Sequence, residues 1–399
     1  MPSVTDALLA FSLALVVTWI ATPIAKRVAW RIGAIDEPRE RGLHQFPTAR
    51  LGGVAILAGV LAASIVFLPN DRQTHGILVG ATAIAAVGTA DDLFDLPADV
   101  KLLGQVLAAV IPVVAGVRVE TMTLPFLGHL DLAWMAYPLT VLGIVAVMNA
   151  VNFIDGVDGL AAGVCTIAAI TFAVIALSLD RNAAGVLAML TAGAALGYLR
   201  HGFHPASIFL GDSGSNLLGL LLAVIVVQGA LKTNAVVALV FPLVILAVPI
   251  LDSSFVIAKR IKYGRPVYEA DRWHFHHRFA DIGFSQRRTV AYLYGWTLTL
   301  AALALALRFV PYSDDHGNFD LGWSLVLAAF FVVTLAASVY LVLVLEIFKV
   351  KRFRQFQLRH DRTVRGQPPP DEVEVEAAVA HELETGEFGA VESQGKSRS

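Results

Sequence analysis

The sequence predicts an all-α protein, a polytopic integral membrane bundle of about eleven transmembrane helices. Of its 399 residues, 56% are hydrophobic and only 16% are charged, and the mean hydropathy is +0.68. Soluble globular chains carry more charge, because their surface must face water. The apolar residues also gather into runs that are long enough to cross a hydrocarbon core, which makes a membrane protein the expected class.

Each apolar run is predicted to form one helix. The runs cover residues 6-27, 51-69, 76-90, 103-118, 134-150, 160-179, 183-199, 214-230, 234-252, 289-309 and 321-346. The first run is too long for the apolar core of a cleaved signal peptide, and Lys26 and Arg27 follow it. We therefore expect it to be a retained membrane anchor.

Lysine and arginine concentrate on one set of alternate loops, chiefly residues 26-50 and 259-288 and the segment 349-365. Basic loops stay in the cytoplasm, so this side is predicted to be cytoplasmic. With an odd number of spans, the N-terminus then lies outside and the C-terminus lies in the cytoplasm. Cys165 is the only cysteine, so no intrachain disulfide is expected.

Three regions are predicted along the chain. Residues 1-348 form the transmembrane domain with its cytoplasmic loops. Residues 349-370 form a basic juxtamembrane segment, which we expect to lie against anionic lipid headgroups. Residues 371-399 are acidic, follow three prolines and are expected to be disordered.

Five polar segments fall on the predicted cytoplasmic face. They are IDEPRERGLHQFPTARLGG (35-53), ADDLFDLPADVK (90-101), NAVNFIDGVDGLAAG (149-163), FLGDSGSNLLG (209-219) and DRWHFHHRF (271-279). The predicted external loops show no such density of polar groups. This distribution favours an active site on one face over a conduit through the membrane.

The second segment places Asp91, Asp92 and Asp95 at the end of an apolar run. An ionised group at membrane depth costs about 3 kcal/mol, so such groups usually mark function or lie at the interface. Adjacent carboxylates suit Mg²⁺, which keeps its remaining positions for phosphate and water. Lys101 adds a point charge suited to a phosphate. For Asp95, a solvated loop remains an equal alternative.

The third segment spaces Asn149, Asn152, Asp155 and Asp158 three residues apart. If the helix extends that far, these amides and acids share one of its faces. Helix capping would explain Asp158 alone, but it would not explain all four residues.

The fourth segment predicts a helix N-terminus whose free amides form an anion site, with Ser213 or Ser215 as the N-cap. Beside a bound anion, the carboxylate of Asp212 requires a cation between them. Asp212 is therefore the leading candidate for a metal ligand.

The fifth segment gathers the basic side chains of His274, His276, His277 and Arg278. A zinc site is the rival interpretation, but the arginine would repel a cation and the chain offers no cysteine partner there. Donors to a diphosphate, with the arginine as a clamp, fit better. A solvated loop is the remaining alternative.

Taken together and in this order, the five segments resemble the polyprenyl-phosphate N-acetylhexosamine-1-phosphate transferases over about residues 35-285. The resemblance implies that the acidic loop and the NxxNxxDGxDGLA segment belong to the active site. It implies catalytic roles for Asp91, Asp92, Asp155 and Asp158, and Mg²⁺ or a substituting Mn²⁺ held by Asp212 and Asp92. It also implies that Asp95, Lys101, Asn149, Asn152, Ser213 and the residues His274 to Arg278 bind substrate.

The implied reaction transfers N-acetylglucosamine 1-phosphate from UDP-GlcNAc to undecaprenyl or another polyprenyl phosphate, the first membrane step of cell-envelope glycan synthesis. In the branch that uses UDP-MurNAc-pentapeptide, three consecutive histidines are expected, whereas Phe275 interrupts them here. That branch stays open as an alternative. A secondary transporter or lipid flippase is the alternative from another class, and a catalytically dead scaffold is disfavoured because the acidic motifs are intact.

The resemblance further implies a bacterial plasma membrane location with the active site facing the cytoplasm. The expected partners are the polyprenyl phosphate carrier, the nucleotide sugar and membrane lipids, with no nucleic acid. A homodimer is compatible with the family, although no residue demands it.

Overall fold

The structure is a computed structural model. It describes residues 3–37, 46–124, 128–230, 246–251, 254, 285–312, 320–346, 373 and 377. The chain divides into two units, one comprising Met1–Ser254 and Ser285–Thr334 and the other Phe255–Phe284 and Leu335–Ser399. Three of the predicted polar segments, 90-101, 149-163 and 209-219, lie in the first unit.

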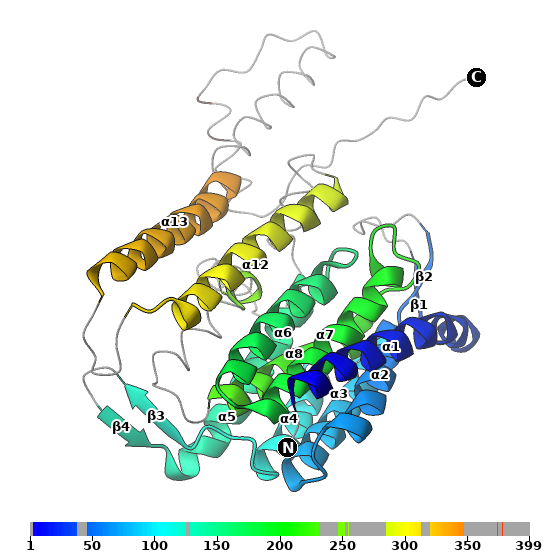
Figure 1. The fold of residues 1–399 in the computed structure, drawn as a ribbon. Coiled ribbons are helices and arrows are strands. Elements are labelled where there is room, and N and C mark those ends of the chain that lie inside the picture. The colour runs from blue at the N-terminus through cyan, green and yellow to red at the C-terminus, as the bar shows by residue number, and fades with distance from the viewer. Residues whose placement is uncertain are drawn as a thin grey trace. The chain divides into compact units, whose positions relative to one another are not determined.

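The described chain is predominantly helical, which confirms the predicted all-α class (Figure 1). Its long helices are α1 (Val4–Ile32), α2 (Gly52–Phe67), α3 (Arg72–Phe94), α4 (Ala98–Val114), α5 (Ala136–Ile154), α6 (Leu160–Ser178), α7 (Asn182–Gly202), α8 (Gly211–Ala230), α12 (Gln286–Phe309) and α13 (Leu321–Glu346). Each coincides with a predicted apolar run. The predicted run at 234-252 lies largely outside the described residues, as do the juxtamembrane segment and nearly all of the acidic tail.

Within the described residues, 8 helices are long and apolar enough to cross a membrane. The helix α2, with 16 residues, is a shorter apolar helix. The chain is therefore a multi-pass helical membrane protein. The total of about eleven spans and the orientation of the termini remain predictions.

Two short hairpins interrupt the helical pattern, and the sequence did not predict them. In the first, β1 (Ile35–Asp36) pairs antiparallel with β2 (Thr48–Ala49). In the second, β3 (Thr121–Leu124) pairs antiparallel with β4 (Gly128–Asp131). Strands of two to four residues are too short to show an alternating pattern. The first hairpin matters here, because Ala49 also bridges to Ile208 just before α8.

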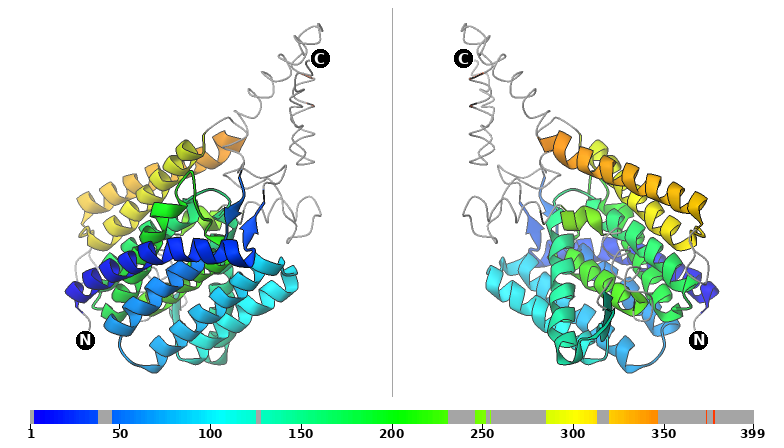
Figure 2. Two further views of the ribbon diagram at one scale, coloured as in Figure 1. Left: turned by 90° about the vertical axis from the view of Figure 1, so that its right-hand side faces the viewer. Right: turned by 90° about the vertical axis from the view of Figure 1, so that its left-hand side faces the viewer.

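The helices pack closely where small residues face each other, as expected between membrane helices. Helices α1 and α7 lie side by side in Figures 1 and 2, and Ala7, Ala10 and Ala14 on α1 are buried. A Cβ atom at Gly193 of α7 would lie 2.2 Å from the carbonyl oxygen of Phe11. Backbone approach of this kind leaves no room for a side chain.

Glycines also allow two helices to pack closely against the first turn of α8. A Cβ atom at Gly53 of α2 would lie 2.1 Å from the nitrogen of Gly214, and one at Gly88 of α3 would lie 2.4 Å from the Cα of Ser213. Glycine is required at both places because any side chain would meet backbone. The start of α8 is therefore enclosed by α2 and α3.

Candidate active site

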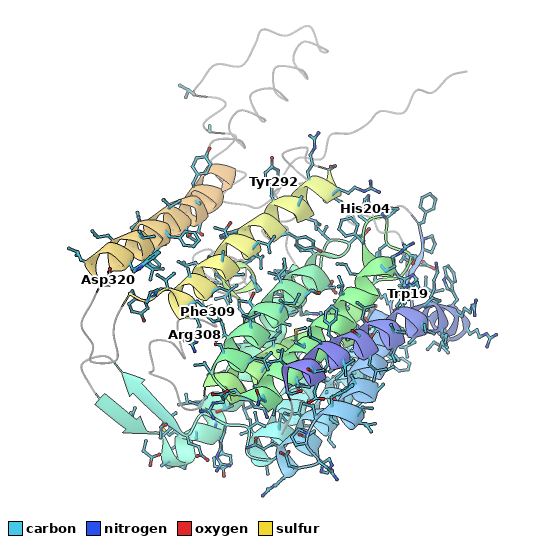
Figure 3. The ribbon with its side chains drawn as sticks, in the orientation of Figure 1. Trp19, His204, Tyr292, Arg308, Phe309 and Asp320 are labelled. Atoms are coloured by element: carbon cyan, nitrogen blue, oxygen red, sulfur yellow. The ribbon has the colours of Figure 1, made fainter. Side chains whose placement is uncertain are left out.

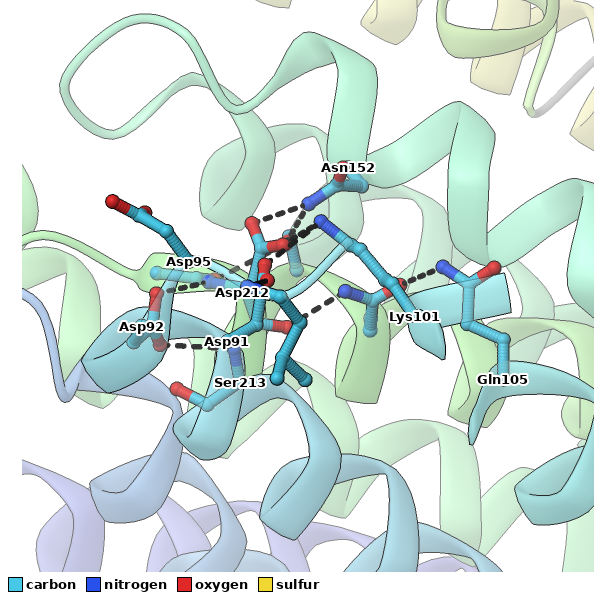
Figure 4. Close-up of polar contacts among 12 residues, drawn as sticks. Asp91, Asp92, Asp95, Lys101, Gln105, Asn152, Asp212 and Ser213 are labelled. Carbon is cyan, nitrogen blue, oxygen red and sulfur yellow. Dashed lines mark hydrogen bonds and ion pairs between the residues drawn. The ribbon is translucent and has the colours of Figure 1, made fainter. Parts of the chain in front are cut away.

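The candidate site forms where four helix ends meet (Figure 4). Asp91 and Asp92 lie in the last turn of α3, and Lys101 lies in the first turn of α4. Asn152 lies in the last turn of α5, and Asp212 lies in the first turn of α8. The structure thus brings together residues from three of the five polar segments, as the sequence predicts.

The turn between α3 and α4 is built on Asp91 and Asp95. Asp95 caps α3 in the left-handed conformation, with φ 47°, and its N–H donates to the carbonyl of Asp91. The Oδ1 atom of Asp91 accepts from the N–H of Leu96 at 2.9 Å. The side chain of Asp95 is 78% exposed and lies 3.9 Å from Arg50. Asp95 therefore lies at the rim, whereas Asp91 points into the cluster.

Lys101 joins the acidic groups of α3 and α8. Its Nζ atom lies 3.1 Å from Oδ2 of Asp91 and also contacts Oδ2 of Asp212. The other oxygen of Asp212 accepts from Nδ2 of Asn152 at 2.9 Å. Two carboxylates from distant parts of the sequence therefore share one cationic group.

Asp92 has a different role in the geometry, because it caps α8. Its Oδ1 accepts from the N–H of Asp212 at 2.9 Å, and its Oδ2 accepts from the N–H of Ser213 at 3.2 Å. The helix begins at Gly211, which has a φ of 72°. A carboxylate at a helix N-terminus is stabilised by these amides and by the helix dipole.

Two predictions about this helix start are wrong as a result. Ser213 and Ser215 lie inside α8 and are fully buried, so neither is the N-cap. The amides of Asp212 and Ser213, predicted to be free for an anion, donate to Asp92. The capping group comes from 120 residues earlier in the chain, which local sequence patterns do not reveal. The predicted contact of Ser213 with substrate is left as a prediction.

A buried network of side-chain amides lies beneath the acidic cluster, and two of its members, Gln105 and Asn216, were not predicted from the sequence. Gln105 accepts from Nδ2 of Asn149 at 2.8 Å and donates to Oδ1 of Asn216 at 2.7 Å. Asn216 in turn donates to the backbone carbonyl of Asp212 at 2.8 Å. The available signal was the spacing of four residues between Lys101 and Gln105, which places both on one face of α4.

The third polar segment is not one continuous helical face. Helix α5 ends at Ile154 with Asp155 as its C-cap, so only Asn149 and Asn152 share a face of α5. Asp155 is partly buried, and its pKa is raised well above the usual value, first because it is withdrawn from water and then because Asp92 and Asp158 add negative charge. Asp155 therefore lies within electrostatic reach of both acids.

Asp158 anchors the loop that leads into α8. Its Oδ2 atom accepts from the N–H of Ala206 at 3.0 Å and lies 2.9 Å from Nδ1 of His204. The helix-capping interpretation of Asp158 is therefore wrong: Gly159 is the N-cap of α6, which has no side-chain cap, and Asp158 binds loop backbone at Ala206 instead. His204 was not predicted as part of the site, because a lone histidine carries no local signal.

Helix α12 forms hydrogen bonds to two of these loops, the one before α6 and the one before α8. Arg287 donates to the carbonyl of His204 at 3.4 Å, and the hydroxyl of Tyr294 donates to the carbonyl of Gly159 at 2.6 Å. His204 and Tyr292 lie toward the same end of this unit, and Arg308 lies at the opposite end of α12 (Figure 3).

The fifth polar segment was predicted to bind substrate and precedes α12 in sequence. Its residues His274, His276, His277 and Arg278 lie outside the described residues.

In the described part of the chain, no group of three or more histidine, cysteine, aspartate or glutamate side chains is arranged to hold a metal. The carboxylates that do converge are those of Asp91 and Asp212, with the amide of Asn152 beside them. Mg²⁺ is often held by only one or two carboxylates together with substrate phosphates. These residues therefore fit such an ion. Asp92 as a ligand remains a prediction.

Fold and site together are those of a multi-pass membrane protein in which carboxylates at helix ends gather around a cation. A profile of glycosyl transferase family 4 matches residues 74–230. A protein of Bacillus subtilis, described as a probable undecaprenyl-phosphate N-acetylglucosaminyl 1-phosphate transferase, is 40% identical over 300 residues, which are 74% of this chain and 84% of the relative. The chain therefore belongs to glycosyl transferase family 4.

Other relatives fall into two groups. A decaprenyl-phosphate N-acetylglucosaminephosphotransferase of Mycobacterium leprae is 37% identical over 327 residues, which are 74% of this chain and 82% of the relative. A phospho-N-acetylmuramoyl-pentapeptide-transferase of Desulforudis audaxviator is 34% identical over 337 residues, which are 76% of this chain and 98% of the relative. Both groups of relatives are similar to this chain over most of their length.

Proposed function

We propose that this chain transfers N-acetylglucosamine 1-phosphate from UDP-GlcNAc to a polyprenyl phosphate such as undecaprenyl phosphate. An oxygen of the lipid phosphate attacks the phosphorus that is linked to the sugar. The bond from that phosphorus to the bridging oxygen breaks, and UMP leaves with the bridging oxygen. The observation that carries the proposal is the convergence of Asp91 and Asp212 on one cationic position at the start of α8.

The charges of the substrates explain why such a position is needed. A nucleotide diphosphate and a lipid phosphate repel each other, so catalysis depends on cations and donors placed between them. Asp212 and Asp91 would hold Mg²⁺, with Asn152 beside them and Asp92 as a further predicted ligand. The ion would neutralise charge on the phosphates when bound. Lys101 supplies a second positive charge from the same face.

Asp91 positions groups rather than removing a proton. One oxygen of its carboxylate accepts from the N–H of Leu96 and the other contacts Lys101, so both oxygens already have partners within the protein. The second pKa of a phosphate monoester is about 6, so the lipid phosphate is already mostly dianionic at neutral pH. A general base would therefore add little to the attack. An Asp91→Asn variant whose rate recovers at high pH would argue for a base role instead.

Two observations support UDP-GlcNAc as the donor. The relatives with N-acetylglucosamine in their names are 40% and 37% identical, against 34% for the muramoyl-pentapeptide relative. Phe275 also interrupts the histidine run that the resemblance associates with the pentapeptide branch. We further propose a bacterial plasma membrane location with the site facing the cytoplasm, and a homodimer is compatible with this proposal.

The test is release of UMP from UDP-GlcNAc by the purified full chain in detergent with undecaprenyl phosphate, with and without Mg²⁺. We expect Mg²⁺-dependent release that an Asp212→Ala variant loses. Release from UDP-MurNAc-pentapeptide but not from UDP-GlcNAc would show that the donor is wrong. If the folded protein released UMP from neither donor, transferase activity would be refuted and the transporter interpretation would be favoured.

A further inference from the structure

Lys101 lies between two carboxylates that converge from different helices. Its Nζ atom contacts Oδ2 of Asp91 and Oδ2 of Asp212, and these oxygens are the ones that converge from α3 and α8. The two carboxylate side chains are only 14% and 23% exposed, so water screens them poorly. A cation held there is therefore strongly attracted.

The described surroundings offer these two acids no other ion pair. Arg50, on the neighbouring loop, forms an ion pair with Asp36, and its Nη1 atom lies 3.9 Å from Oδ1 of Asp95 at the rim of the cluster. The other described hydrogen-bond donors to the Asp91 and Asp212 side chains, the N–H of Leu96 and the amide of Asn152, are neutral. Lys101 is thus the charge that balances these carboxylates in the described part of the chain.

We propose that Lys101 is a placeholder cation: its ammonium group fills the metal position in the free protein and leaves when a divalent ion binds. The ion and the ammonium group need the same two oxygens, and their positive charges repel each other at that distance. A lysine side chain can make this move because it is a point charge on a flexible four-carbon stem. The released group is then free to contact a phosphate, a step that rests on the proposed function.

The placeholder role has a consequence that a supporting role lacks. If Lys101 competes with the metal, removing its charge tightens metal binding while it lowers turnover. If Lys101 only held the carboxylates in place, the same substitution would weaken metal binding and turnover together. The two roles therefore predict opposite signs for the change in metal affinity.

The experiment measures Mn²⁺ binding to the purified full chain in detergent, from the electron paramagnetic resonance signal of free Mn²⁺, without nucleotide or lipid. We expect Lys101→Gln to bind Mn²⁺ at least tenfold more tightly than the parent chain, a factor equivalent to about 1.4 kcal/mol. Lys101→Arg keeps the positive charge and should therefore not tighten Mn²⁺ binding. Lys26→Gln, which removes the same charge on α1, is the matched control and should change nothing.

Equal or weaker Mn²⁺ binding by Lys101→Gln than by the parent chain would overturn the proposal. It would also be overturned if neither the parent chain nor any Lys101 variant showed Mn²⁺ binding that is lost on substitution of Asp212. Should Lys101→Gln fail to fold, Lys101→Met retains most of the aliphatic stem and tests the same loss of charge. UMP release is measured separately. Tighter Mn²⁺ binding without UMP release would leave the placeholder standing and reject the proposed function.

Discussion

Replacing Gln105 with leucine tests whether the buried amide network holds the acidic cluster in place. Leucine matches the bulk of glutamine but can neither donate nor accept a hydrogen bond. Gln105 is 1% exposed and Asn216 is equally buried, so water cannot replace the lost partner. The substitution removes the bond from Asn149 and the bond to Asn216.

The cost can be worked from these two bonds. A buried polar group left without a partner costs about 1–3 kcal/mol. Interhelical hydrogen bonds in membranes have measured values of about 0.6 kcal/mol on average and about 1.7 at most. Asn149 also keeps its bond to the carbonyl of Val145 at 2.9 Å, so its loss is partial. We therefore apply the values measured in membranes to each of the two lost bonds, which gives a total loss of about 1–3 kcal/mol in the free energy of unfolding.

Catalysis should suffer along with stability, because Asn216 donates to the carbonyl of Asp212. Displacing that carbonyl moves the first turn of α8, and we expect kcat to fall about tenfold or more, since small misplacements are costly in active sites. The assays are thermal unfolding in detergent by tryptophan fluorescence and UMP release from UDP-GlcNAc.

The matched control for Gln105→Leu is Thr191→Val. Thr191 is fully buried, but among the described residues its hydroxyl bonds only to the carbonyl of Leu187 in its own helix. We expect the control to keep its kcat and to unfold at a temperature close to that of the parent. A Gln105→Leu variant with the melting temperature and kcat of this control would refute the reasoning.

Two further predictions concern the loops around the cluster. Tyr294→Phe removes the hydrogen bond to the carbonyl of Gly159 at 2.6 Å and should lower kcat or raise the KM for UDP-GlcNAc severalfold. The control variant Tyr340→Phe should change neither constant. Equal kinetics for both variants would show that α12 does not position the loop at Gly159. Because burial raises the pKa of Asp155 above its unfolded value of about 4, ionisation costs stability as pH rises through that window. The melting temperature of Asp155→Asn should therefore rise relative to that of the parent chain as the pH is raised above about 4, and a difference that stays constant or shrinks would contradict the sign.

Much of the fold followed from the apolar runs, because spanning a membrane requires long helices that satisfy their own backbone groups. The predicted run at 134-150 stops four residues before the end of α5 at Ile154. The sequence carried a signal for it, since Gly156 and Gly159 flank the acids and glycine commonly ends helices. The equal spacing from Asn149 to Asp158 suggested a longer helix than the one that forms.

Which candidate residues lie near one another was easier to predict than the contacts that they make. The sequence placed Asp91, Lys101 and Asp212 on one face, and the structure brings them into contact. It could not show that Asp92 caps α8, because that bond joins residues 120 apart. Gln105 escaped notice because one amide in an apolar helix resembles a chance substitution until its partners on α5 and α8 are known.

The cap that Asp92 provides for α8 also constrains the order of events during synthesis. The acids of α3 leave the ribosome 120 residues before the amides that they will bind. At about 5–20 residues per second, this interval lasts about 6–24 s. Through that time the acidic end of α3 must remain hydrated at the bilayer surface, because an unpaired buried carboxylate is too costly. The candidate active site is therefore assembled late, and a nascent chain that stops before Gly211 cannot complete it.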